Sequence, residues 1–118
     1  MSRQRPEQLR KAVRARVARI QDKVRQMDYV CSGTLVRRWK VCGKAVCRCA
    51  QDPGARHGPY YEWGYMEGGR QVHRMVSPEQ AKVLRAAIKN YRTIRGLLRA
   101  WEAESVRIIE AQKQANAR

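Results

Sequence analysis

A cluster of three cysteines and one histidine constrains this chain more than any other feature. The four residues Cys42, Cys47, Cys49 and His57 follow the spacing C-x4-C-x-C-x7-H. Zinc prefers four tetrahedral thiolate and imidazole ligands, and a tight turn with three thiolates and a returning imidazole supplies that number. In a reducing compartment such as the cytoplasm, where we expect this protein, clustered cysteines are more often metal ligands than disulfides. The spacing therefore predicts a zinc site that stabilises a small fold.

The fourth ligand has an alternative in Cys31, which would make an all-cysteine site. Cys31 precedes a predicted strand that leads into Cys42, so it lies away from the cluster or serves as a buried thiol. We favour His57 as the ligand, against the simpler interpretation of a loop histidine bonded to backbone. His73 is interpreted as an ordinary strand residue.

A closed four-ligand site leaves no position for a reactive water, so we expect a structural site and no enzyme. The chain lacks the His-x-Glu and Pro-Cys-x-x-Cys pattern of zinc deaminases. A small nuclease ranks third among the functions considered, because several of the 10 acidic residues would have to converge.

The charge balance is the second strong feature. The 118 residues include 26 Lys and Arg against 10 Asp and Glu, a formal net charge of +16. Such a chain repels itself unless a polyanion or counterions neutralise it. Basic residues run through every segment, which favours nucleic acid over a membrane surface, although a solvated basic face is the plainer interpretation. No apolar run approaches the roughly 18 residues that span a bilayer, and we expect no secretory leader.

Two amphipathic helices are predicted, one at each end of the chain. Over residues 6–27 an apolar stripe recurs at steps of four and three, with basic residues on the other faces. The segment Ser77-Pro78-Glu79-Gln80 is a typical helix start, with a capping serine and a reciprocal glutamine. The long helix that follows carries Leu84, Ile88, Tyr91, Ile94, Leu98, Trp101 and Ile108 in one stripe. The two helices pack on each other or on another copy.

The middle of the chain has the alternation of β-strands. A short strand is expected within residues 29–41, and residues 60–66 and 70–76 alternate on either side of Gly68-Gly69, which predicts a hairpin. The fold class is thus α+β, a small zinc-knuckle and three-stranded antiparallel module flanked by a basic N-terminal helix and a long C-terminal helix. The segments are 1–28, 29–76 and 77–118, expected to form one compact unit.

Cations alternate with aromatic residues through this middle segment. Cations neutralise phosphates, and exposed rings stack on bases. We expect Tyr61, Trp63 and Tyr65 to serve mostly as core, which leaves Tyr60 as the aromatic contact. The candidate nucleic-acid contacts are Arg10, Arg14, Arg37, Arg38, Lys40, Lys44, Arg48, Arg56, Tyr60, Arg70 and Arg74.

These motifs resemble a family of small basic proteins of uncharacterised function from prokaryotes and their mobile elements. The resemblance covers Gly33-Thr34-Leu35 to Arg38, the knuckle Cys-Gly-Lys-x-x-Cys-x-Cys, His-Gly-Pro-Tyr-Tyr and Gly68-Gly69, and then runs into the long helix. The first helix lies outside it. The resemblance implies a metal-binding module with Cys42, Cys47, Cys49 and His57 as ligands and implies no activity, and Cys31 has no counterpart in its pattern.

Taken together, the sequence predicts a zinc-stabilised protein that binds DNA or RNA mainly through phosphate contacts. We expect it to act as an accessory subunit of a mobile-element or ribonucleoprotein complex, and its helices to offer a surface for a protein partner or a homodimer. The alternative is an adaptor or phage-type inhibitor that docks on another protein through its helices and basic surface.

Overall fold

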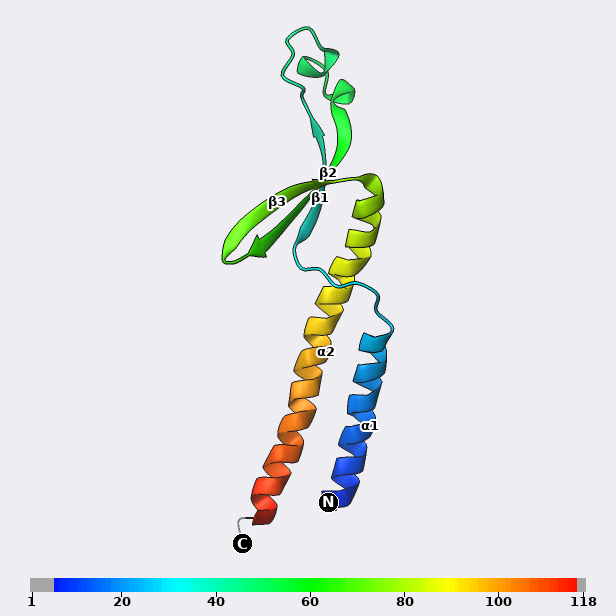
Figure 1. Cartoon of the computed structure of the whole chain (residues 1–118), viewed down its shortest axis with the longest axis vertical. Coiled ribbons are helices and arrows are strands. Elements are labelled where there is room, and N and C mark those ends of the chain that lie inside the picture. Colours follow the sequence, from blue (N-terminus) through cyan, green and yellow to red (C-terminus); the bar gives the residue numbers. More distant parts are fainter. Residues whose placement is uncertain (1–5, 117–118) are drawn as a thin grey trace. The chain divides into compact units, whose positions relative to one another are not determined.

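The computed structural model describes residues 6–116 of the chain. It contains two helices, α1 (Pro6–Arg25) and α2 (Pro78–Asn116), and three strands, β1 (Thr34–Lys40), β2 (His57–Glu67) and β3 (Arg70–Val76) (Figure 1). Two short 3-10 helices, η1 (Arg48–Ala50) and η2 (Pro53–Ala55), lie between β1 and β2. The expected α+β class is therefore confirmed.

The contacts divide the chain into two units. Among the described residues, we call 6–28 with 92–116 the helical unit, and 29–91 the sheet unit. The helix α2 supplies residues to both. The single compact unit that we expected stays a prediction.

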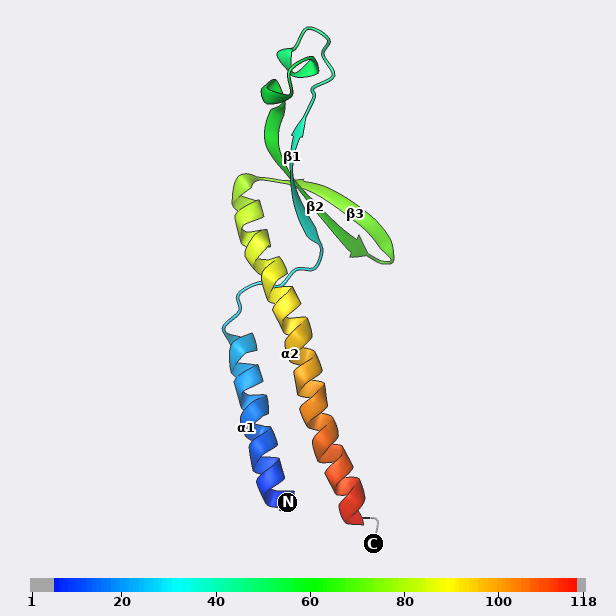
Figure 2. The same ribbon diagram turned by 180° about the vertical axis from the view of Figure 1, so that it is seen from behind.

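In the helical unit, α1 runs antiparallel to the later part of α2, as Figures 1 and 2 both show. The 4-and-3 spacing of the α1 stripe places Val13 and Ile20 at the contact, where they are 4% and 8% exposed. The Nε atom of Arg16 donates to Oε1 of Glu104 at 2.6 Å, and this ion pair joins the two helices. The sequence left helix pairing open, and the structure pairs α1 with α2 of the same chain.

The apolar stripe predicted on α2 needs one correction in the helical unit. Leu98 is 57% exposed, whereas its neighbour Leu97 is half-buried together with Trp101 and Ile108. The half-buried positions are spaced by four and then seven residues, which follows the 3.6-residue period of the α-helix around its inner face. Leu98 falls about 100° away from Leu97, on the open side.

The sheet unit is built around a three-stranded antiparallel sheet in the order β1-β2-β3. Thr34 pairs with Gly64 at one end of β1 and Lys40 with His57 at the other, with a bulge between Arg38 and Lys40. Glu67 pairs with Arg70 across the two-glycine turn, as the alternation predicted. The strand expected within residues 29–41 begins only at Thr34, because Gly33 adopts φ +112° just before it.

The start of α2 packs on this sheet. Ser77 Oγ accepts from the Gln80 amide at 3.0 Å, and Gln80 Oε1 accepts from the Ser77 amide at 2.8 Å, so the predicted capping box is formed. The buried residues of the unit include Ala81, Leu84, Ala87 and Ile88 from this part of the helix. The core is small, as expected for such a chain.

The aromatic side chains of β2 contribute less to the core than we expected. Tyr61, Trp63 and Tyr65 are half-buried, and none of them is buried. The rings of Trp63 and Tyr65 stack at 4.0 Å between centroids, and Trp63 Nε1 donates to the Ser32 carbonyl at 2.9 Å. Because the sheet has a helix over only part of one face, its aromatic rings keep one side open. No helix within the described residues is long and apolar enough to cross a membrane.

Candidate metal centre and its basic ribbon

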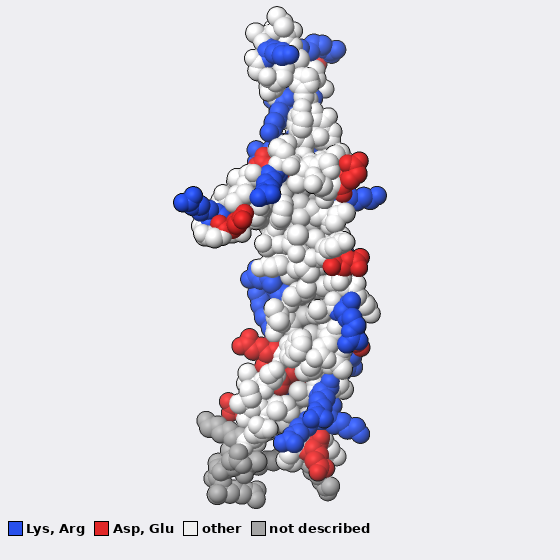
Figure 3. Space-filling model, in the orientation of Figure 1, with Lys and Arg blue, Asp and Glu red and all other residues white. Residues whose placement is uncertain are grey.

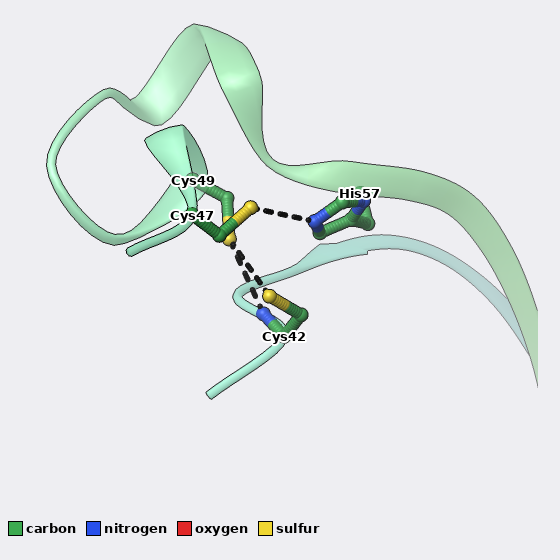
Figure 4. A group of neighbouring side chains, drawn as sticks. All are labelled: Cys42, Cys47, Cys49 and His57. Carbon is green, nitrogen blue, oxygen red and sulfur yellow. Dashed lines mark hydrogen bonds between the residues drawn. The ribbon is translucent and has the colours of Figure 1, made fainter. Parts of the chain in front are cut away.

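The cysteine cluster occupies the loop between two paired strands. Cys42 lies two residues after the end of β1, Cys47 precedes η1, Cys49 lies within η1, and His57 is the first residue of β2 (Figure 4). Because Lys40 pairs with His57 across the ladder, the sheet itself brings both ends of the loop together. The residues in between fold back through two 3-10 turns, and Asp52 Oδ1 accepts from the Gly54 amide at 2.9 Å to cap the second.

The four candidate ligand atoms lie within 4.8 Å of one another. The Sγ atoms of Cys42 and Cys49 are 3.4 Å apart, and Cys47 Sγ lies 3.3 Å from His57 Nε2. A regular zinc tetrahedron has edges of about 3.8 Å between two sulfurs and about 3.5 Å between sulfur and nitrogen. Both observed distances are slightly shorter than these values. The group can therefore hold a metal ion with small side-chain movements.

Hydrogen bonds and burial shift the pKa values of Cys47 and Cys49 in opposite directions. Hydrogen bonds from the Cys49 backbone amide and the His57 ring lower the pKa of Cys47 from 9.0 to about 6. The backbone amide of Cys42 donates to Cys49 Sγ at 3.3 Å and favours its thiolate. Burial and the neighbouring sulfurs outweigh that bond and raise the pKa of Cys49. Close thiols that compete for protons in this way are what a dication would neutralise.

The backbone conformation and the close neighbours of residue 58 explain why a glycine follows the candidate ligand His57. The Gly58 φ of +143° lies in a region that L side chains rarely adopt. A Cβ atom there would lie 2.8 Å from the Arg38 carbonyl oxygen and 3.1 Å from Cδ1 of Trp39. The close approach of β2 to β1 beside His57 thus requires glycine. Gly43 in the knuckle also has a positive φ, +84°, but its missing Cβ would meet nothing within 4 Å.

The two other sites considered from sequence lie elsewhere. Cys31 is half-buried, its amide donates to the Ala87 carbonyl at 3.2 Å, and it is not a member of the four-residue group. It lines an apolar hollow of about 510 Å³ between the sheet and the start of α2. Nδ1 of His73 lies 3.1 Å from Oε1 of Glu62 on the neighbouring strand, so its partner is a carboxylate.

Seven of the predicted nucleic-acid contacts, six cations and Tyr60, lie on one continuous segment. We call residues 34–60, which comprise β1, the knuckle and the first residues of β2, the basic ribbon. Its exposed cations are Arg37, Arg38, Lys40, Lys44, Arg48 and Arg56. The ribbon has one acidic residue, Asp52, and Arg48 pairs with it at 3.3 Å. Figure 3 shows Lys and Arg side chains on this part of the sheet unit with little acidic surface beside them.

The remaining predicted contacts are distributed more widely. Arg70 lies at the hairpin turn, and the guanidinium of Arg74 lies 5.9 Å from the ring centroid of Tyr65. Arg10 and Arg14 belong to the helical unit, on α1. Within the ribbon itself, Tyr60 is 41% exposed, as expected for a contact residue.

Sequence reasoning missed Trp39 as a candidate contact. This residue is 47% exposed, and the Arg37 guanidinium lies 4.8 Å from its ring centroid. Trp39 is one of the aromatic residues that alternate with cations in the middle segment, but only Tyr60 was selected as a contact. Sequence reasoning also did not identify Val46 at the tip of the loop, which is 97% exposed. The glycines and the proline after the knuckle were the only signal in the sequence that this part of the strand pair is exposed to solvent.

A comparison with protein-family models assigns the chain to a family. The model of a protein family described as a domain of unknown function (DUF6788) matches residues 6–86, and the chain belongs to this family. The match includes the basic ribbon, the hairpin and also α1, so our expectation that the first helix lies outside the family pattern was wrong. Comparison with curated proteins and with solved structures found no match to this chain.

Proposed function

We propose that the chain is a zinc-stabilised nucleic-acid-binding protein that contacts mainly the phosphate backbone. The observation that carries this proposal is the coincidence of the Cys3His cluster with the segment of six exposed cations and a single acid. The metal would fix the loop, and the loop and its strands would present the cations. We place the protein in the cytoplasm, as an accessory subunit of a mobile-element or ribonucleoprotein complex.

Zinc is the metal that the donor set favours. Three thiolates with one imidazole in a tetrahedral arrangement select zinc over hard cations, which prefer oxygen ligands. Four protein ligands complete the coordination and leave no position for a reactive water, so we assign the metal a structural role and no catalysis. When bound, zinc supplies cross-linking of the loop in a chain with little core.

The ribbon keeps its positive charge even with the metal site counted. Six cations and Asp52 sum to +5. Three thiolates and one Zn²⁺ sum to −1, so the loaded ribbon carries about +4. The single acid of the ribbon, Asp52, is paired with Arg48, which leaves the other five cations for a ligand. Phosphates are the ligands that this surface attracts.

Oligonucleotide binding across ionic strength tests the proposal. Five phosphate contacts, one for each ribbon cation other than the paired Arg48, predict a slope of log affinity against log salt of about −3.5 for a single strand and −4.5 for a duplex. Affinity should then fall about 100- to 500-fold between roughly 50 and 200 mM salt. No binding at low salt, or binding that salt leaves unchanged, would contradict the proposal.

Charge-matched variants separate the ribbon from the overall charge. Replacing Arg38 and Lys40 with glutamine should reduce the steepness of the salt slope by about 1.4 to 1.8. The control replaces Lys82 and Arg85, two exposed cations on the α2 part of the sheet unit. The same charge is removed there, so an equal loss in both variants would show that only net charge counts.

A protein-docking function is the second candidate. The exposed apolar residues Leu98, Val106 and Ile109 of α2 favour it, with exposures of 57%, 46% and 61%. Such residues on a helix can cover a partner helix or a second copy of the chain. If docking is the function, Leu98→Glu with Ile109→Glu will abolish association measured by sedimentation and leave oligonucleotide affinity unchanged.

A further inference from the structure

Two exposed aromatic rings on the basic ribbon set it apart from a surface that only attracts charge. Trp39 of β1 is 47% exposed and Tyr60 of β2 is 41% exposed. Each has a cation beside its ring: Arg37 lies 4.8 Å from the Trp39 centroid, and Lys40 Nζ lies 5.8 Å from the Tyr60 centroid. Ring and cation therefore come in pairs along the ribbon.

The two adjacent strands β1 and β2 carry these rings. Trp39 lies against the Gly58 backbone, where a Cβ atom would stand 3.1 Å from its Cδ1 and 3.2 Å from its Cα. Tyr60 pairs with Arg38 across the β1–β2 ladder, and Trp39 lies in β1 at the bulge between Arg38 and Lys40, so both rings belong to strands. The Trp39 ring, which lies against Gly58, loses little conformational freedom when a ligand stacks on it.

Paired rings and cations match one form of nucleic acid better than the other. In a duplex the base faces are stacked on each other, and proteins reach only base edges and phosphates. An unpaired strand exposes its base faces, which stack on aromatic side chains while neighbouring cations bind the phosphates. Phosphate contact alone would leave the two rings without a partner.

We propose that the basic ribbon selects single-stranded nucleic acid, with bases stacked on Trp39 and Tyr60 and phosphates held by Arg37 and Lys40. This proposal rests on the nucleic-acid function proposed above. It names the class of polymer. Single-stranded DNA and RNA present the same stacking and phosphate chemistry, so both are included in the test.

The test compares zinc-loaded protein on labelled oligomers of about 16 nucleotides, a length that spans one small binding site. The probes are oligo-dT, oligo-rU and a duplex of mixed sequence, followed by fluorescence anisotropy. The parent should prefer the single strands. Trp39→Leu and Tyr60→Leu should each weaken single-strand binding about 5- to 150-fold and change duplex binding less than about twofold. The salt slope should stay as in the parent, because no cation is removed.

Two further variants make the result specific to stacking. Trp39→Phe keeps a ring and should stay within about threefold of the parent. Tyr29→Leu removes a ring that is 66% exposed but lies outside the ribbon, so it should have no effect. Zinc content and thermal unfolding of each variant confirm an intact fold. Should Trp39→Leu fail to fold, Tyr60→Leu alone decides the question.

The outcomes distinguish this proposal from the one it rests on. Duplex binding equal to or tighter than single-strand binding would overturn single-strand selection and leave the nucleic-acid function standing. Equal losses for Trp39→Leu and Trp39→Phe, or none for Tyr60→Leu, would overturn stacking. No binding to any of the three probes at low salt would overturn both.

Discussion

Replacing Gly58 with alanine should weaken metal binding, although residue 58 is not itself a ligand. The new Cβ would stand 2.8 Å from the Arg38 carbonyl oxygen and 3.1 Å from Cδ1 of Trp39. The strained φ of +143° costs about 1–3 kcal/mol, and the overpacking costs about the same again. Relief of this strain requires β2 to move away from β1, which carries His57 away from Cys47. The free energy of unfolding of the metal-loaded state therefore falls by up to about 2–6 kcal/mol.

Competition with a chelator measures the metal affinity of the Gly58→Ala variant, and urea unfolding of the loaded protein measures its stability. Each 1.4 kcal/mol transferred to the site weakens metal binding about tenfold. Gly68→Ala is the control, because Gly68 also has a positive φ, +56°, but its Cβ would meet nothing within 4 Å and it lies in the hairpin turn. If Gly58→Ala keeps the metal affinity and stability of the parent, the close approach of the strands does not position His57.

Three further predictions concern other parts of the chain. In metal-free protein, alkylation of Cys47 should rise with a midpoint near pH 6, whereas Cys49 should react only above its ordinary pKa of 9.0. The stability that the Cys47 thiolate gives to the folded state should be lost as pH falls from 9 through 6. Gly96→Ala should raise the free energy of unfolding by about 0.5–1 kcal/mol in urea melts, because its Cβ would meet nothing within 4 Å on α2. Glu104→Leu should cost about 1–3 kcal/mol by leaving Arg16 unpaired. Adding Arg16→Leu should restore stability, because Arg16 Nη2 and Glu104 Oε2 are already unsatisfied within the described residues. A double variant less stable than the single would refute this.

Local patterns in the sequence were sufficient for the elements of this fold. The capping box at Ser77 and Gln80, the two-glycine turn and the periodicity of α1 each depend on neighbouring residues, and each is formed as predicted. The grouping of Cys42, Cys47, Cys49 and His57 also followed from spacing, because a short loop between paired strands limits the distances between these side chains.

The exposure of side chains could not be predicted from local sequence patterns, because it depends on which other elements cover them. The alternation of Tyr61, Trp63 and Tyr65 indicated a core face, but only the packed structure shows that these rings stay half-buried. The exposure of Trp39 depends on where α2 ends its contact with the sheet, which no pattern in β1 encodes. Leu98 and Leu97 are adjacent and equally apolar, so their inner and outer positions were decided by the partner helix.

Metal content of the purified protein tests the central claim most directly. Protein produced without added zinc would be measured by elemental analysis and native mass spectrometry, alongside Cys47→Ser, His57→Ala and Cys31→Ser. The account predicts about one zinc per chain in the parent and in Cys31→Ser, and a marked loss in the other two variants. Less than about half an equivalent in the parent, or loss in Cys31→Ser with retention in His57→Ala, would contradict it.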